Sequence, residues 1–178
     1  MSNASLLLYP SNSTQPPPLL GDLAAYLYQR GVIATPLPTH RYPLGDHFLR
    51  DIAFMGCSPA IRLEPAGSDD HGYCYLTLEG PFDPPQLRHG RNTRPPRCPH
   101  CHQGITPWQA AISGTPLPCP HCHHTAPLDQ LLWRHNAGYA RLFITIHNIF
   151  PGEAIPQPGL LNDLTATFNQ PWGYCFRS

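Results

Sequence analysis

The five-residue sequence CPHCH occurs twice in this chain of 178 residues, at positions 98–102 and again at 119–123. Each copy holds two cysteines with two residues between them, so a single tight turn can direct both sulfurs at the same ion. The 17 residues between Cys101 and Cys119 match the separation typical of a zinc site built from two such pairs. We therefore predict that each chain binds one zinc ion in a tetrahedral shell of four thiolates, supplied by Cys98, Cys101, Cys119 and Cys122.

The segment 97–127 resembles the zinc-ribbon class, in which two turns of the form CPxCG hold one zinc ion between short antiparallel strands. The four cysteines carry over directly, and Pro99 and Pro120 match the proline that follows the first cysteine of each turn. The resemblance implies a structural metal centre. The glycine of the CPxCG turn is replaced here by His102 and His123. This position often needs a positive φ, which histidine tolerates better than most residues.

Two other kinds of site use the same Cys-Pro-His-Cys-His residues. Cys-x-x-Cys-His is also the attachment motif of c-type haem, and two copies would hold two haems. Such haem is attached outside the cytoplasm, whereas residues 1–30 lack the basic start, apolar core and cleavage site of a signal peptide. CPHC also resembles the active-site motif of strongly oxidising periplasmic thiol oxidoreductases, but that motif needs a strand before it and a helix after it, which RNTRPPR and HQGITPW do not predict. Both readings stay as alternatives to zinc.

Five histidines crowd the two motifs, and one of them could replace a cysteine as ligand or hold a second ion. Because four sulfurs already complete the shell, we expect solvated turn residues at His100, His102, His121, His123 and His124. A tetrathiolate zinc has no open position for water or substrate, and the chain has no nucleophile elbow, phosphate-binding glycine loop or HExxH helix. We predict no catalytic residues, and we interpret the polar segment GSDDHG at 67–72 as a turn.

Arginines gather beside the first motif and a tryptophan follows it, at Arg88, Arg91, Arg94, Arg97 and Trp108. These side chains could contact phosphates and stack on a base, which makes nucleic acid a candidate partner. Neighbouring arginines would, however, also offset the charge of a zinc ion bound by four thiolates, and the chain has a net charge of zero. We therefore expect another protein as the partner, with nucleic acid as the alternative. No apolar run approaches the roughly 18 residues that cross a bilayer, so no membrane contact is expected.

The remaining cysteines, Cys57, Cys74 and Cys175, lie among apolar and aromatic residues, where reduced cysteine behaves as a small hydrophobic side chain. An odd number of cysteines outside the two motifs argues against a framework of disulfides. We therefore expect a cytoplasmic protein.

The 24 prolines and the charged fraction of 12% predict that much of the chain is irregular. Apolar residues at helical spacing predict helices over 19–30, 128–133 and 160–168. Alternating or continuous apolar runs predict strands over 5–9, 48–55, 60–64, 72–79, 141–150 and 172–176, with 32–37 at a sheet edge. Residues 81–96 contain five prolines and are interpreted as a tether that leads into the zinc ribbon.

Two similar segments within the sequence suggest how these elements combine. LLGDLAAYL at 19–27 and LLNDLTATF at 160–168 match at five of nine positions, and each follows a strand and precedes another. Two strand-helix-strand halves predict a ferredoxin-like α+β fold, an antiparallel sheet with two helices on one face. We expect residues 1–93 and 128–178 to form this α+β domain and residues 94–127 to form an inserted zinc ribbon.

Overall fold

A computed structural model describes residues 4–35, 41–55, 61–67, 72–150 and 152–178. Along these residues the elements are β1 (Ser5–Pro10), α1 (Leu20–Arg30), α2 (Phe48–Asp51), β2 (Ile52–Phe54), β3 (Tyr75–Glu79), β4 (Gln86–His89), a 3₁₀ helix η1 (Gln109–Ser113), β5 (Leu117–Pro118), β6 (Thr125–Ala126), β7 (Ala137–Ala140), β8 (Phe143–His147), β9 (Ala154–Pro156), α3 (Pro158–Phe168) and β10 (Trp172–Arg177). In this part of the chain, no helix has the length and apolar character that crossing a bilayer requires.

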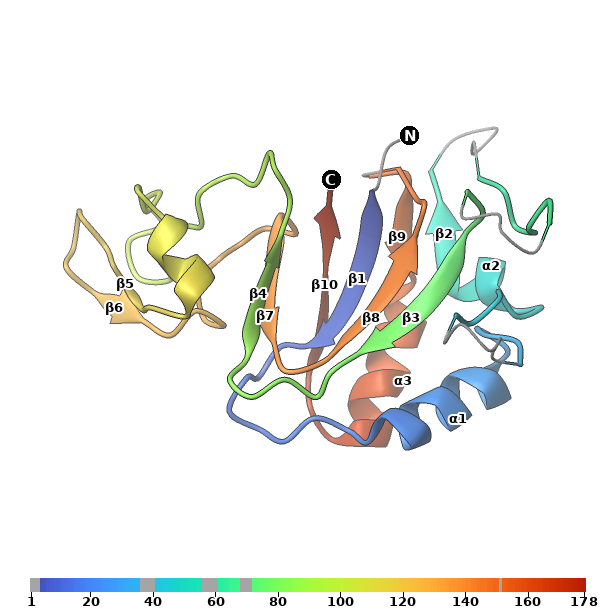
Figure 1. The fold of residues 1–178 in the computed structure, drawn as a ribbon. Helices are drawn as coiled ribbons and strands as arrows, with labels where there is room; N and C mark the ends of the chain where they lie inside the picture. The colour runs from blue at the N-terminus through green and yellow to red at the C-terminus, as the bar shows by residue number, and fades with distance from the viewer. Residues whose placement is uncertain (1–3, 36–40, 56–60, 68–71, 151) are drawn as a thin grey trace.

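The main sheet has four strands in the order β10-β1-β8-β3, and every neighbouring pair is antiparallel (Figure 1). The elements β1, α1 and β3 form one strand-helix-strand unit, with α2 and β2 between α1 and β3, and β8, α3 and β10 form a second, with β9 between β8 and α3. The strands of the two units alternate across the sheet. This is the arrangement expected from two ferredoxin-like halves. The predicted α+β class with an antiparallel sheet is therefore confirmed.

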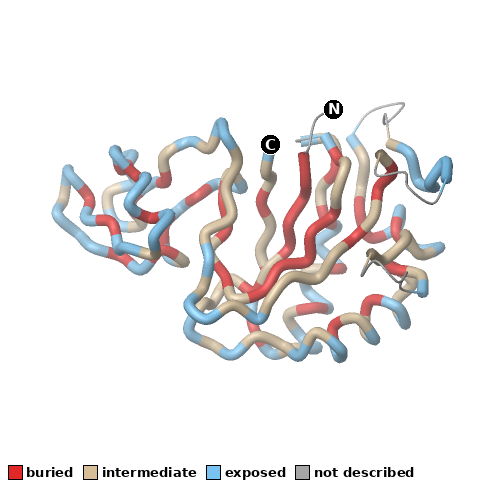
Figure 2. Tube along the Cα trace, in the orientation of Figure 1, coloured by how far each residue is buried: buried red, intermediate tan, exposed pale blue. Residues whose placement is uncertain are grey.

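Both long helices pack on the same face of the sheet. The apolar side chains of α1 and α3 share one buried cluster with alternate residues of β1, β3 and β8. Its members include Leu23 and Leu27 of α1, Leu160 and Leu164 of α3, and Leu6, Leu8, Leu76, Ile144 and Ile146 of the strands. Alternate residues of a strand point to the same side, so these contacts define one helix-covered face. Figure 2 shows the buried central strands between less buried edges. This face forms the principal core.

The opposite face of the sheet is covered in part by the strand pair β4–β7. A second cluster joins Leu7 and Phe143 of the sheet to Ala140 of β7, with Tyr9 and Phe82 packed against it. The fit is tight at Gly138 of β7, where an added Cβ would lie 2.4 Å from the Tyr9 ring. The segment between β4 and β7 extends from this strand pair.

Residues 90–136, here called the excursion, run from the end of β4 to the start of β7 and extend away from the main sheet (Figure 1). They contain η1 and the short pair β5–β6 and build a core of their own. Its buried members include Ile105, Trp108, Leu117, Leu131 and Trp133. The two CPHCH motifs lie in this segment.

Several predicted elements differ in the structure. Residues 48–51 are helical and only Ile52–Phe54 forms a strand, because Phe48 and Ile52 are both buried at a spacing of one helical turn. The expected helix at 128–133 is a turn at 128–130 followed by a β-bridge between Leu132 and Arg97. Residues 61–64 contain no strand, and the supposed tether contains β4, which pairs with β7. Cys57 and the middle of the expected 67–72 turn lie outside the described residues.

Candidate metal centre

Each CPHCH motif forms a knuckle, at residues 98–103 and 119–124, with the same backbone hydrogen bonds. In the first knuckle the amide of Cys98 donates to the carbonyl of Gln103 at 2.9 Å, and the amide of His102 donates to the carbonyl of Cys98 at 3.0 Å. In the second knuckle the amides of Cys119 and His123 donate to the carbonyls of His124 and Cys119, both at 2.9 Å. The repeated sequence therefore produces a repeated turn.

Short antiparallel ladders hold both knuckles. The first lies between Arg97 and Gly104, which form a β-bridge, and the second connects β5 to β6. Each knuckle is thus the tip of a minimal hairpin, and the residue after its second cysteine closes the turn. His102 and His123 occupy this place with φ of 60°. The positive φ expected where histidine replaces glycine is present at both positions.

The four sulfurs converge on one point between the knuckles. The Sγ atoms of Cys98 and Cys122 are 3.7 Å apart, those of Cys101 and Cys119 are 3.5 Å apart, and all four lie within 4.8 Å of one another. A tetrahedron with Zn–S bonds of about 2.3 Å has sulfurs about 3.8 Å apart. None of these four cysteines forms a disulfide. These four residues are therefore close enough together to hold one metal ion.

The thiols of Cys119 and Cys122 differ in pKa, in part because of their hydrogen bonds. Burial raises the pKa of Cys119, but the amides of Cys122 and His121 and the neighbouring thiols bring it down to about 6. The amide of His124 acts to lower the pKa of Cys122, yet burial and the other three thiols raise it to about 12. One thiolate therefore forms easily and opposes ionisation of its neighbours. A bound dication would remove this opposition, because coordination deprotonates thiols.

The surroundings favour a closed site. Cys98 and Cys119 are fully buried in the core of the excursion, and Cys101 and Cys122 are half-buried against it. Four sulfur ligands leave a tetrahedral ion without a position for water or substrate. The arrangement can hold the two knuckles together, and it offers no place for a reaction on the metal.

The geometry does not favour the haem and dithiol alternatives. The closest sulfurs belong to different motifs, so the two cysteine pairs face one another and leave no room for a separate haem on each. A redox motif of the CPHC type requires a helix after its first cysteine. Turns and extended residues follow Cys98 and Cys119 here.

The five histidines of the motifs lie outside the sulfur cluster, and all are exposed. His100 and His124 stack on each other across the two knuckles, with ring centroids 5.6 Å apart. Among the described residues, the four cysteines alone form a group of three or more ligand side chains close enough to hold one ion.

The residues considered for partner binding occupy different environments. Arg88 lies in β4, where its guanidinium donates to Glu79 at 2.8 Å and lies over the Phe82 ring. Trp108 is only 8% exposed, and its ring meets that of Trp133 edge to face at 5.7 Å. Arg91, Arg94 and Arg97 are exposed. Two of the five candidate residues are thus engaged in packing.

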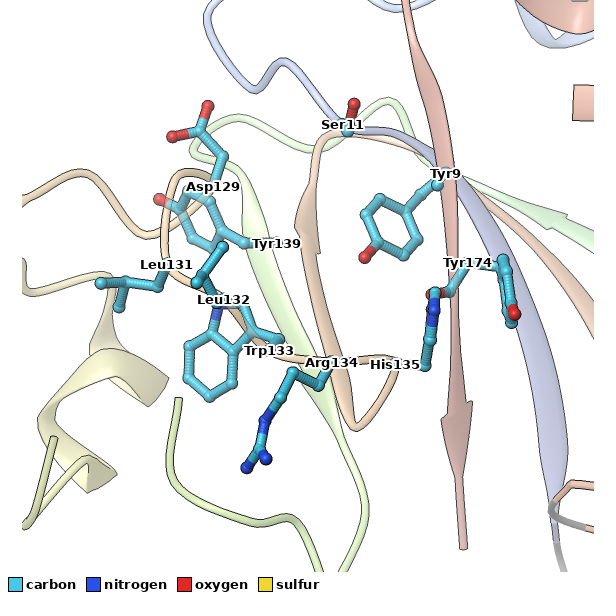
Figure 3. A pocket seen from close by; sticks show the side chains of 11 residues that line it. Tyr9, Ser11, Asp129, Leu131, Leu132, Trp133, Arg134, His135, Tyr139 and Tyr174 are labelled. Atoms are coloured by element: carbon cyan, nitrogen blue, oxygen red, sulfur yellow. The ribbon is translucent and has the colours of Figure 1, made fainter. Parts of the chain in front are cut away.

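A cleft of about 350 Å³ separates the excursion from β1 and β10 (Figure 3). Its lining is rich in aromatic side chains and includes Tyr9, Trp133, Arg134, His135, Tyr139 and Tyr174. His135 donates from Nδ1 to the carbonyl of Tyr174 at 2.9 Å and stacks on its ring at 4.0 Å. Sequence reasoning missed this cleft, because its walls come from three segments that are distant in the chain.

Comparisons of this chain with protein-family models, with curated proteins and with solved structures find no match. The assignment of a function therefore rests on the geometry of the site.

Proposed function

We propose that this protein is a non-enzymatic zinc-binding protein, in which one zinc ion per chain holds the excursion in a zinc-ribbon fold. The observation that carries the proposal is the convergence of four thiols from two equivalent knuckles, with sulfurs 3.5 Å and 3.7 Å apart across the site. Cys98, Cys101, Cys119 and Cys122 would hold the ion. Zinc would supply cohesion to a segment whose own apolar core is small.

Metal analysis of protein purified without added metal tests this proposal. We expect about one zinc per chain, a colourless protein without a Soret band, and thiols of the knuckles that become titratable only after chelation. A Cys101→Ser, Cys119→Ser double variant should lose the ion. Two metal ions per chain, a bound haem, or full thiol reactivity in the untreated protein would contradict it.

We further propose that the excursion is a surface for another protein. The cleft beside it supports this proposal, since aromatic residues and arginine are enriched at protein interfaces. Leu132 adds an apolar side chain that is 38% exposed at its rim. A nucleic-acid partner has less support, because Arg88 is paired with Glu79 and Trp108 is packed in the core.

Site-specific crosslinking distinguishes the two partner classes. A photoreactive amino acid would replace Leu132 at the cleft or, as the matched control, Leu19, which is 72% exposed beside α1. We expect a discrete protein adduct from position 132 alone, lost when zinc is chelated. Adducts to RNA or DNA, or equal protein adducts from both positions, would contradict the proposal.

A further inference from the structure

The four sulfurs of the metal centre differ in their access to solvent. Cys98 and Cys119 are fully buried, whereas Cys101 and Cys122 are half-buried. The half-buried cysteine is the second one of each knuckle, and the histidines on both sides of it in the sequence are exposed. A small oxidant in solution therefore reaches the sulfurs of Cys101 and Cys122 more easily than the other two.

Each accessible sulfur lies beside a buried sulfur of the other knuckle. Cys101 Sγ is 3.5 Å from Cys119 Sγ, and Cys122 Sγ is 3.7 Å from Cys98 Sγ. A disulfide needs its sulfurs about 2.05 Å apart, so each pair has to close by roughly 1.5 Å. The site thus contains two pairs, each with one sulfur that an oxidant can reach and one that can complete the bond.

We propose that the metal centre is a redox switch, in which hydrogen peroxide converts the four zinc ligands into two disulfides that join the knuckles. The inference rests on the proposed zinc site. The thiolate of Cys101 or Cys122 attacks one oxygen of the peroxide, the O–O bond breaks, and the cysteine becomes a sulfenic acid with hydroxide as the leaving group. The buried sulfur of the same pair then attacks the sulfenic sulfur, and the S–O bond breaks as the S–S bond forms. Each disulfide thus consumes two thiolates, one peroxide and two protons, and the peroxide is reduced to two molecules of water.

The oxidised excursion differs from a chelated one. Thiolates are the form of cysteine that binds metal, so closing both pairs removes all four ligands. Both new bonds connect the two knuckles, as the metal does. The loop between Cys101 and Cys119 contains Ile105, Trp108 and Leu117 of the excursion core, and a disulfide across this loop restricts the unfolded chain. We therefore expect oxidation to remove zinc while the core of the excursion stays closed.

Peroxide treatment of the zinc-loaded protein, with a chromogenic chelator as the reporter, tests the proposal. We expect release of the zinc ion with about two molecules of peroxide consumed per chain, and recovery of zinc binding after a thiol reductant is added. The same mixture without peroxide measures any loss to the chelator itself. Tryptophan emission of the oxidised protein should stay at short wavelength. Peptide mapping should find the disulfides Cys101–Cys119 and Cys98–Cys122.

Dimedone, which traps sulfenic acids, identifies the sulfur that reacts first. We expect the label on Cys101 or Cys122. Cys74 and Cys175 are the internal controls, since both are 0% exposed and should remain unlabelled. Labelling of these controls as fast as the knuckles would overturn the proposal, because exposure would then not select the site.

Zinc that is retained under excess peroxide would also overturn the proposal, and so would disulfides formed within one CPHCH motif. Zinc loss accompanied by emission at longer wavelength would show that the disulfides do not hold the core closed, against the proposal. A protein that contains no zinc after purification would instead contradict the proposed function, so the two failures are distinguishable.

Discussion

His102 and His123 have left-handed backbone conformations at the same point of the two knuckles, where a glycine would bear no strain. A non-glycine residue in this region costs on the order of 1 kcal/mol or more. Binding of a structural zinc ion contributes roughly 10 to 16 kcal/mol in small zinc modules, so the strain is readily offset. In each knuckle the four residues Cys-Pro-His-Cys form the turn, and the histidine that follows them adopts the positive φ that completes it.

Changing His123 to valine should weaken zinc binding, because a β-branched side chain is poorly tolerated at positive φ. We expect an affinity loss of roughly five- to thirtyfold, corresponding to about 1 to 2 kcal/mol, in competition with a chromogenic chelator. His123→Gly should bind zinc at least as well as the native chain. His121→Val is the control in the same knuckle, since His121 has no positive φ. Equal losses in both valine variants would show that backbone strain is not the cause.

His147 should make stability depend on pH in a defined direction. Burial and the charges of Arg177 and Arg41 lower its folded-state pKa to about 4, while Glu79 acts to raise it. An unfolded chain with a histidine pKa near 6.5 then binds more protons between these values, so lower pH destabilises the fold. The slope is at most about 1.4 kcal/mol per pH unit, it vanishes above about pH 6.5, and it levels off near pH 4.

Denaturant unfolding of the native chain and of His147→Gln at several pH values measures this contribution. The difference between the two proteins cancels effects of zinc release, which both share. We expect the native chain to lose stability relative to the variant as pH falls from about 6.5 toward 4. A difference that does not change with pH would show that His147 is not held neutral.

At the scale of elements, the pair β4–β7 connects the zinc-bearing excursion to the sheet. Arg88 joins the two parts, because it pairs with Glu79 of β3 and lies over the rings of Phe82 and Phe143. Glu79 also accepts a hydrogen bond from the buried Thr145. The ion pair is partly buried, with both side chains 26% exposed, so loss of one partner leaves the other charge poorly solvated.

Arg88→Ala should therefore lower the free energy of unfolding of the sheet by about 1 to 3 kcal/mol. Arg91→Ala changes an exposed residue at the end of the same segment and should cost less than about 0.5 kcal/mol. Chemical denaturation of both variants provides the comparison. If the two substitutions have equal effects on stability, Arg88 is not a structural residue.

The sequence predicted these elements unevenly, for physical reasons. The strands at 5–9 and 172–176 and both long helices were recognisable, because each buries an apolar face whose period appears within one segment. The pair β4–β7 was missed, since β4 is a short strand within a proline-rich segment, β7 contains Gly138, and the two are stabilised by pairing across about fifty residues. The sulfur ligands were predicted by local spacing. The cleft was not, because it gathers side chains from distant segments.

At the scale of the whole molecule, the two largest apolar cores lie in different parts of the chain. The larger core lies between the helices and the sheet and includes Trp172, and the smaller core lies in the excursion and includes Trp108 and Trp133. The cysteine ligands belong to the smaller core alone. Zinc removal should therefore open one core and leave the other, and the three tryptophans report on them separately.

Chelation of zinc, or the substitution Cys122→Ser, should shift tryptophan emission to longer wavelength as the rings of Trp108 and Trp133 become exposed to water. The Trp172→Phe variant should keep this shift, and a Trp108→Phe, Trp133→Phe double variant should lose it, because Trp172 remains packed against Phe168. Circular dichroism should still show cooperative unfolding of the zinc-free sheet and helices, whose core contains no ligand. If chelation instead abolishes cooperative unfolding or shifts the emission of Trp172, zinc stabilises the entire molecule and the two cores fold as one unit.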